Sequence, residues 1–367
     1  MAAPGATRDE EIEVARCSRA DRAEQARLYA ACFKKPLPSG GLEWRYDASP
    51  AGESVSLVAR ASDGLAISGY ACSPRDALVG GDERTLATVG ETGDVMTHPQ
   101  WRKRGFFSRL DRAAMDEARR RGWALAFGLP NRRSAHIFLE LGWERIGSVR
   151  PHLFVLRADD TARDARGKDG RWKRWTTGFE QRRCARARNT LGARAGTFHI
   201  ERVERFDARA TALARAVEPR FGFMVRRSAE YLNWRFLDTP SGLHRAFALL
   251  DGATLAAYVV VQVPRAGERS GFLVDVLARD EAGLAAALET GLTELARTGA
   301  SVVEATALEQ SWWAQQLVRA GFAPRGDEHA LSVILHPLQD AHPLVAAARD
   351  TSKWYFTDGD RDDETVG

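Results

Sequence analysis

The chain has 367 residues but only four cysteines, Cys17, Cys32, Cys72 and Cys184. These cysteines are far apart and include none of the close pairs that zinc sites and redox motifs use. We therefore expect reduced thiols, no bound metal and a location in the cytoplasm.

Long apolar runs are also missing. No stretch approaches the roughly 20 apolar residues that a membrane-spanning helix needs. The opening MAAPGATRDEEIE lacks the hydrophobic region of a signal peptide. The sequence thus predicts no membrane span and no secretion signal.

A strong excess of one charge is absent as well. The net charge is only +4, although the isoelectric point is near 9.0, so composition does not indicate a nucleic-acid partner. Hydrophobic residues make up 44% of the chain and charged residues 28%, which is typical of a globular protein. At typical domain sizes of roughly 100 to 200 residues, the length suggests two domains.

What the sequence does contain is an informative stretch at residues 91–122. A short β-prone run ends at His98 and Pro99, a basic cluster follows, and Gly105 opens an amphipathic segment. Gly122 fits a left-handed helix cap at the other end. The pattern predicts a strand, a basic loop and a helix, because apolar residues recur at steps of three and four: Phe106, Leu110, Ala113, Ala114 and Ala118.

The start of this helix has the features of an anion site. The first backbone N–H groups of a helix have no partner within it and carry partial positive charge. Gly105 would let an oxygen approach them, and Arg102, Lys103 and Arg104 precede it. The loop therefore predicts binding of a phosphate or pyrophosphate. A surface loop that is merely rich in arginine is the alternative.

The full pattern resembles the GNAT superfamily of acetyl-CoA-dependent N-acetyltransferases. Its signature is Gln/Arg-x-x-Gly-x-Gly/Ala after a strand, and Arg102 and Gly105 match it while Phe107 replaces the final small residue. Asn131, followed by a helical pattern and the pair Gly142-Trp143, is similar to the second GNAT signature.

The surrounding elements agree with the order of that fold. We expect a helix at residues 21–33, where Asp21 and Glu24 have the spacing of a capping box. A hairpin is expected to turn at Asp63-Gly64, and a final strand to lie near residues 145–156.

The resemblance implies that acetyl-CoA is the donor and that no metal is required. By position in the motif, strand residues would contact the thioester, loop residues the pyrophosphate and an asparagine the pantetheine arm. The implied binding residues are Val95, Met96, Thr97, Arg102, Lys103, Arg104, Gly105, Phe106, Phe107 and Asn131.

A catalytic base is also expected, because the attacking amine must be neutral. Glu91 is the first candidate, since it lies eleven residues before Arg102, which matches the base glutamate of histone-acetyltransferase members. Its pKa would have to rise from about 4 through burial, or water would have to pass on the proton. Asp94 and His98 are further candidates on the same strand.

The general acid of many GNAT members is missing. They place a tyrosine seven residues after the asparagine, whereas this chain has Phe138. Either coenzyme A leaves as an unassisted thiolate or another residue, such as Tyr46, protonates it.

The second half repeats the first. Trp44-Arg45 and Pro50 recur as Trp234-Arg235 and Pro240 at a constant spacing of 190 residues. The counterpart of the basic loop contains Asp280 and Glu281, which would repel a pyrophosphate. We therefore predict an α/β (α+β) protein of two GNAT-like domains in tandem, each with a mixed, mostly antiparallel sheet flanked by helices, the second degenerate.

The predicted boundaries are 10–156 for the catalytic domain, 157–197 for a basic linker and connector helix, 198–337 for the degenerate domain and 338–367 for the tail. The basic linker is interpreted as a connector rather than a nucleic-acid patch. Trp312 and Trp313 are expected in the core, and disorder is expected beyond about Asp360.

The resemblance therefore implies an N-acetyltransferase, which we expect to act on a primary amine of a small molecule or amino sugar in a ternary complex, as a monomer or homodimer. One alternative is a non-catalytic or regulatory acyl-CoA-binding module. Another is a different tandem-GNAT acyltransferase, of the Fem type or similar to mycothiol synthase.

Overall fold

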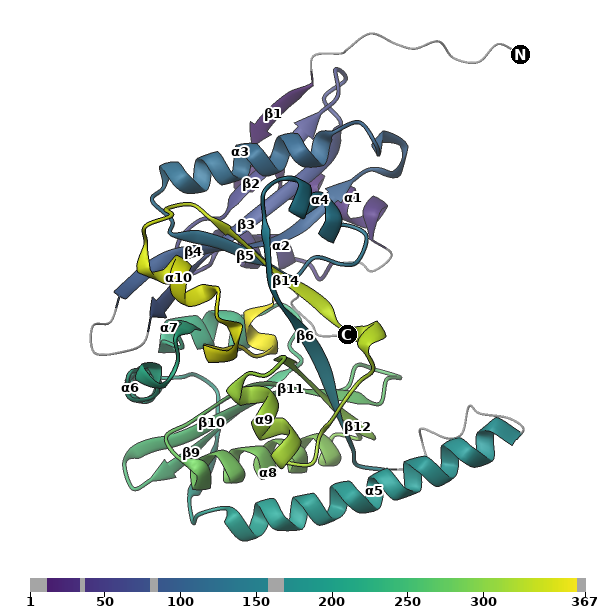
Figure 1. The fold of residues 1–367 in the computed structure, drawn as a ribbon, viewed down its shortest axis with the longest axis vertical. Helices are drawn as coiled ribbons and strands as arrows, with labels where there is room; N and C mark the ends of the chain where they lie inside the picture. The colour runs from purple at the N-terminus through teal and green to yellow at the C-terminus, as the bar shows by residue number, and fades with distance from the viewer. Residues whose placement is uncertain (1–11, 34–36, 80–84, 158–167, 362–367) are drawn as a thin grey trace.

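The first half of the chain folds into the predicted succession of helix, hairpin, strand, helix, strand, helix and strand. The structure, a computed structural model, describes residues 12–33, 37–79, 85–157 and 168–361. The first unit, at the top of Figure 1, comprises β1 (Glu13–Arg16), α1 (Arg22–Cys32), α2 (Gly41–Asp47), β2 (Val55–Arg60), β3 (Ala66–Val79), β4 (Thr85–Thr97), α3 (Phe106–Arg120), β5 (Leu125–Gly128), α4 (Ala135–Glu140) and β6 (Glu144–Val155).

The second half repeats this succession after the long helix α5 (Lys168–Arg194). The second unit comprises β7 (His199–Val203), α6 (Ala208–Val217), β8 (Phe223–Val225), α7 (Ala229–Leu232), a π-helical turn (Asn233–Leu237), β9 (His244–Asp251), β10 (Thr254–Gln262), β11 (Ser270–Ala278), α8 (Glu281–Arg297), β12 (Val302–Leu308), α9 (Trp312–Arg319), β13 (Ala323–Pro324) and β14 (Leu331–Pro337). The C-terminal segment, residues 338–361, carries α10 (Pro343–Ala348), β15 (Trp354–Tyr355) and a 3-10 turn (Asp358–Asp360).

One sheet runs through both units. Its strand order is β1-β2-β3-β4-β5-β14-β6-β12-β11-β10-β9-β7, and it is mostly antiparallel. The order has an approximate twofold symmetry, because β5 and β14 on one side correspond to β12 and β6 on the other. The predicted fold of two similar α/β units is confirmed, but their sheets are joined.

The two units exchange their last strands. Strand β14, from the second half, lies between β5 and β6 of the first unit. Strand β6 in turn pairs over residues 149–155 with β12 of the second unit. The units cannot separate without breaking these ladders, and the predicted boundary at residue 156 lies at the end of a shared strand.

Helix α3 has the apolar face that the sequence predicts. Phe106, Leu110, Ala114 and Ala118 are buried against β2, β3 and β4. The helix is followed by Gly122 at φ 77°, the left-handed conformation expected of a glycine after a helix.

The predicted capping box at the start of α1 is wrong. The box is formed one turn earlier, between Ser18 and Asp21, whose side chains cap each other's backbone N–H groups. Glu24 instead accepts hydrogen bonds from Arg60 and from the backbone N–H of Ala66 on the hairpin. The spacing of three residues occurs twice, in Ser18–Asp21 and in Asp21–Glu24. Glu24 is not available for capping because it binds the neighbouring hairpin.

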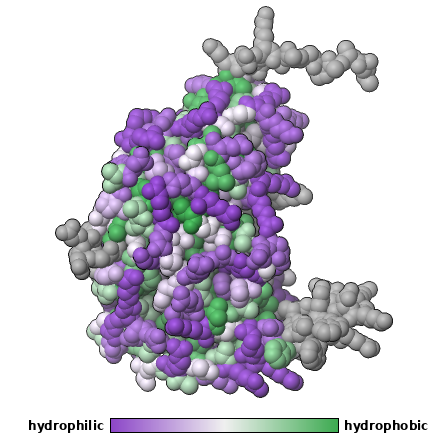
Figure 2. Space-filling view, viewed as in Figure 1, coloured by the Kyte–Doolittle hydropathy of each residue, from purple (hydrophilic) through white to green (hydrophobic). Residues whose placement is uncertain are grey.

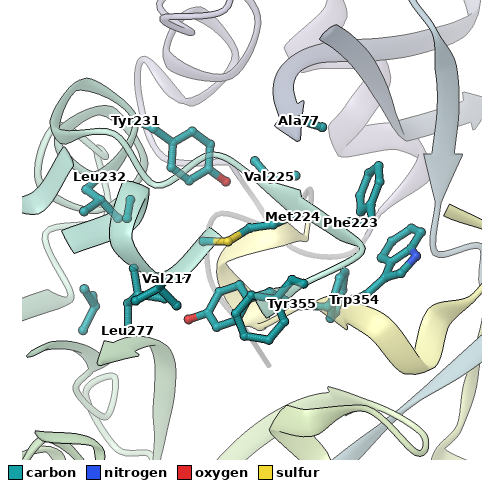
Figure 3. Packing of buried hydrophobic residues seen from close by; sticks show 14 of the residues in the cluster. Ala77, Val217, Phe223, Met224, Val225, Tyr231, Leu232, Leu277, Trp354 and Tyr355 are labelled. Carbon is teal, nitrogen blue, oxygen red and sulfur yellow. The ribbon is translucent and has the colours of Figure 1, made fainter. Parts of the chain in front are cut away.

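The C-terminal segment fills the junction between the units (Figure 3). Trp354 stacks on Phe223 of the second unit at 4.2 Å between ring centroids and meets Phe127 of the first unit edge-on at 5.9 Å. Trp354, Tyr355 and Phe356 are all buried. The segment is therefore part of the core up to Asp360, and residues 362–367 lie outside the described residues.

Helix α5 packs against α8 of the second unit and against β6, the strand shared between the units (Figure 1). Arg188 pairs with Glu289 of α8 at 2.9 Å, and Arg183 donates to the carbonyl of Gly321 at 2.8 Å. These contacts support its interpretation as a connector, although residues 158–167 of the linker lie outside the described residues. Trp313 is buried, as predicted.

Hydrophilic residues cover most of the face seen in Figure 2, with hydrophobic residues scattered among them. Across the described residues, no helix combines the length and apolar composition that a bilayer crossing requires.

Candidate active site

Strand β4 leaves its parallel neighbour β5 near the middle of the first unit. The two strands pair only over residues 90–92 of β4 and 126–128 of β5. Beyond that point residues 93–97 of β4 continue past the end of β5 at Gly128, a region that we call the splay. Backbone groups on that edge of β4 thus lack a strand partner in β5 and can face a ligand.

A β-bulge lies within the splay. Gly69 pairs with Met96 and Ala71 with Gly93, so β4 has one more residue than β3 between these points. Asp94 occupies the bulge at φ 49°, a left-handed conformation that few residues other than glycine adopt. A bulge re-aims side chains and is common beside active sites.

The loop after β4 presents an open helix N-terminus. Gly105 precedes α3 at φ 77°, no side chain caps the helix, and its first turn has no acidic residue. A Cβ atom placed on Gly105 would meet nothing within 4 Å among the described atoms. Arg102 is anchored by donating to the carbonyl of Thr97 at 3.3 Å, and Arg104 stacks on Trp101 at 4.6 Å. The arrangement has the chemistry of an anion site.

Two residues of α2 hold the carboxylate of Asp94. Arg45 forms an ion pair with Asp94 Oδ2, and the Tyr46 hydroxyl donates to the same oxygen at 2.5 Å. Burial and then the adjacent carboxylate raise the pKa of Tyr46 well above its usual value, so Tyr46 keeps its proton. The structure therefore brings together two of the three predicted catalytic residues, Asp94 and Tyr46.

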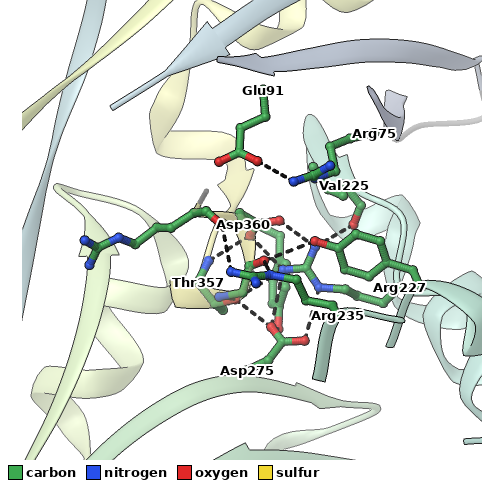
Figure 4. Close-up of polar contacts among 12 residues, drawn as sticks. Arg75, Glu91, Val225, Arg227, Arg235, Asp275, Thr357 and Asp360 are labelled. Carbon is green, nitrogen blue, oxygen red and sulfur yellow. Dashed lines mark hydrogen bonds and ion pairs between the residues drawn. The ribbon is translucent and has the colours of Figure 1, made fainter. Parts of the chain in front are cut away.

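The third, Glu91, lies in a buried polar network between the units (Figure 4). Its Oε2 accepts from Arg75 at 2.5 Å, and its Oε1 is buried without a hydrogen-bond partner among the described residues. Burial raises the pKa of Glu91, an effect that the Arg75 guanidinium partly offsets. Glu91 is only 2% exposed. Its role as the catalytic base remains a prediction.

A family model described as acetyltransferase (GNAT) domain matches residues 13–146. These residues are a GNAT acetyltransferase domain.

Solved structures of low sequence identity share the fold of the whole described chain. A protein of unknown function from Enterococcus faecalis, described as a probable N-acyltransferase, is 12% identical with a TM-score of 0.61, over 89% of this chain and 72% of that one. A GCN5-related N-acetyltransferase from Kribbella flavida is 18% identical with a TM-score of 0.59, over 92% and 74%. A tandem GNAT protein from the clavulanic acid biosynthesis pathway is 15% identical with a TM-score of 0.54, over 90% and 100%. No curated protein matches.

The second GNAT-like unit lacks an open helix start. Asp280 caps α8 by accepting from the backbone N–H of Gly283 at 2.8 Å, and Glu281 follows in the first turn. The predicted acidic residues are thus present at the start of α8, and Asp280 caps the helix. An anion would have to displace Asp280 and oppose two negative charges.

The C-terminal segment also occupies the splay of the second unit, where β11 and β12 pair only over residues 270–272 and 302–304. Asp358 accepts from the backbone N–H of Thr306 on β12 at 2.6 Å, and the Tyr355 hydroxyl donates to the carbonyl of Val276 on β11. The second unit is therefore capped at its helix start and covered along its splay by the C-terminal segment.

The two departures from the GNAT signature touch each other. Phe107 and Phe138 pack edge-on with centroids 4.9 Å apart, and Phe138 packs in the same way on Trp143 at 5.0 Å. Phe138 is buried. The large residue at 107 thus fills space beside the position where related enzymes have a tyrosine.

The remaining predicted binding residues lie around the splay. Asn131 accepts from the backbone N–H groups of Arg133 and Ser134, which orders the turn before α4. The side chain of Met96 packs in the core, whereas Val95 is partly buried. Any contact of these strand residues with a ligand would therefore use their backbone.

The sequence did not single out Arg45 and Arg75 as residues that hold the candidate carboxylates. Arg45 belongs to the Trp-Arg pair that recurs in both halves, so the repeat could have indicated that Arg45 is important. No feature of the sequence distinguished Arg75 from the other arginines. No cluster of three potential metal ligands occurs in the described ranges.

Proposed function

We propose that the protein is an acetyl-CoA-dependent N-acetyltransferase that acts on a primary amine of a small molecule or amino sugar, with chemistry confined to the GNAT domain. The observation that carries this proposal is the open N-terminus of α3 beside the splay. It contrasts with α8, whose N-terminus is capped by Asp280. Only the first unit has the features needed to hold a pyrophosphate.

When bound, acetyl-CoA would supply the thioester whose acetyl group is transferred. Arg102, Lys103, Arg104 and the backbone N–H groups after Gly105 would hold its phosphates. Backbone N–H groups of the bulge would donate to the thioester carbonyl oxygen, where negative charge develops.

We assign the proton transfers to Asp94 and Tyr46. Asp94 uses Oδ2 for both Arg45 and Tyr46, so the amine would approach its other oxygen and lose a proton there. As the C–N bond forms and the C–S bond breaks, Tyr46 would protonate the departing sulfur and recover a proton from Asp94. This pair would replace the tyrosine missing at Phe138.

The test is titration of acetyl-CoA into the full chain by calorimetry. The wild type should bind with a micromolar Kd, and the Arg102→Ala/Arg104→Ala variant should bind at least about tenfold more weakly. The matched control is Arg119→Ala/Arg120→Ala, which removes the same charge from the other end of α3 and should bind like the wild type.

Thiol release is then followed with glucosamine, galactosamine, putrescine and lysine as acceptors. Release with at least one amine supports the proposal. Equal binding by both double variants would refute the assigned site. Binding without release for any amine would favour the second candidate, a non-catalytic acyl-CoA-binding module, which Phe138 at the usual tyrosine position supports.

A further inference from the structure

A pair of tryptophans joins the second unit to α2, the helix that carries Arg45 and Tyr46. Trp44, on α2, donates its indole N–H to the carbonyl of Trp234 at 2.6 Å, and Trp234 donates to the carbonyl of Trp44 at 2.9 Å. The rings stack with centroids 5.3 Å apart, and both residues are buried. This reciprocal pair fixes α2 to the second unit.

Helix α2 depends on such an external anchor. It has only seven residues, it begins after Gly40 at φ 78°, and no side chain caps its start. Short helices are marginal without tertiary packing. The position of α2 decides where Arg45 and Tyr46 lie, and these two residues hold Asp94.

The same tryptophan supports the other candidate carboxylate. The guanidinium of Arg75 stacks over the Trp234 ring at 4.9 Å while it pairs with Glu91. Arg235 lies over Trp44 at 5.4 Å and is held by the carbonyls of Gly359 and Arg361 at 2.9 and 2.7 Å. The arginine that pairs with Glu91 thus rests on Trp234, and a second arginine, Arg235, rests on Trp44.

We propose that Trp234 is a positioning residue of the acetyltransferase site and that this is a function of the otherwise degenerate second unit. The inference rests on the proposed function. Trp234 acts through α2 and Arg45 on Asp94 and touches no substrate. A loose α2 would weaken the Arg45–Asp94 contact, so the carboxylate would be held less firmly where the amine must meet it.

Further charged and polar groups lie around Asp94. Arg45 and Tyr46 face Asp94 from α2, and Arg22 of α1 stacks on Tyr46 at 5.1 Å. Glu91 and its partner Arg75 complete the charged neighbours on β4 and β3.

The test compares Trp234→Phe with Trp313→Phe in the full chain. The first change removes the hydrogen bond to Trp44 but keeps an aromatic ring. The second removes a buried indole N–H of the same unit that has no partner among the described residues. Acetyl-CoA Kd, thermal midpoint, kcat and KM are measured, with glucosamine or the fastest amine of the panel as acceptor.

We expect Trp234→Phe to lower kcat by about tenfold or more, since small misplacements of reacting groups are costly. The acetyl-CoA Kd should stay within about twofold of the wild-type value, because the loop before α3 is untouched. Trp313→Phe should retain the wild-type kcat and acetyl-CoA Kd.

An unchanged kcat in Trp234→Phe would overturn the inference. If Trp234→Phe does not fold, Trp44→Phe breaks the reciprocal bond from the other side and must show the same kinetic change. Absence of turnover in the wild type would instead refute the proposed function.

Discussion

Asp111 offers a test of the fold that is independent of catalysis. It lies on α3 at 2% exposure, and its Oδ1 accepts from the Tyr70 hydroxyl at 2.8 Å and from the Trp143 indole at 3.2 Å. Burial raises the pKa of Asp111 from 3.8 to about 6, although these two hydrogen bonds act in the opposite direction. The carboxyl group is therefore costly to ionise in the folded protein.

The sign of the effect follows from the two pKa values. Between pH 3.8 and about 6 the folded protein retains a proton that the unfolded chain has lost, so stability falls as the pH rises through this window. The full shift of about two units corresponds to about 3 kcal/mol. Between pH 5 and pH 8 the loss is about 1.4 kcal/mol.

Asp111→Asn removes the ionisation and keeps an oxygen that can accept both hydrogen bonds. Relative to the wild type, its free energy of unfolding should therefore increase by about 1.4 kcal/mol between pH 5 and pH 8. Urea denaturation followed by tryptophan fluorescence at both pH values measures this difference. Asp116→Asn, at an exposed position of the same helix, is the control and should show little pH-dependent difference. A difference between Asp111→Asn and the wild type that is the same at both pH values would refute the reasoning.

Two further predictions concern buried charges. Arg227→Met should lower the free energy of unfolding by about 3 to 5 kcal/mol, because two buried aspartates lose their cation. In the same urea titration, Arg205→Met at an exposed ion pair should cost less than about 1 kcal/mol. Equal losses in the two variants would contradict the importance of the buried cation. Asp94→Asn should lower kcat by roughly a hundredfold or more at an unchanged acetyl-CoA Kd, whereas Glu91→Gln should have a smaller effect on kcat. The reverse order would return the role of base to Glu91.

Local features of the chain were predictable because they depend on neighbouring residues. The loop and the helix can be recognised from the apolar spacing in α3, from Gly105 and from the cations before it, because these features do not depend on the rest of the fold. The acidic start of α8 could be recognised for the same reason. The capping box failed because two overlapping candidates existed, and the hairpin partners of Glu24 decided between them.

Pairing between distant segments could not be predicted from such patterns. Strand β14 is inserted between β5 and β6, some of whose residues precede it by about 200 positions. An alternating apolar pattern predicts a strand but does not specify its neighbour. The closure of the second splay by the C-terminal segment depends on the same long-range packing.

The sequence by itself determined the resemblance to the GNAT superfamily, the succession of elements, the basic loop before α3 and the acidic start of its counterpart α8. The tertiary structure alone decided how the candidate catalytic groups are arranged. Asp94 and Tyr46 are 48 residues apart and meet through the bulge in β4. Glu91 becomes buried because the second unit and the C-terminal segment pack over it. Burial and charge pairing between distant residues set these roles, and neither is encoded in local spacing.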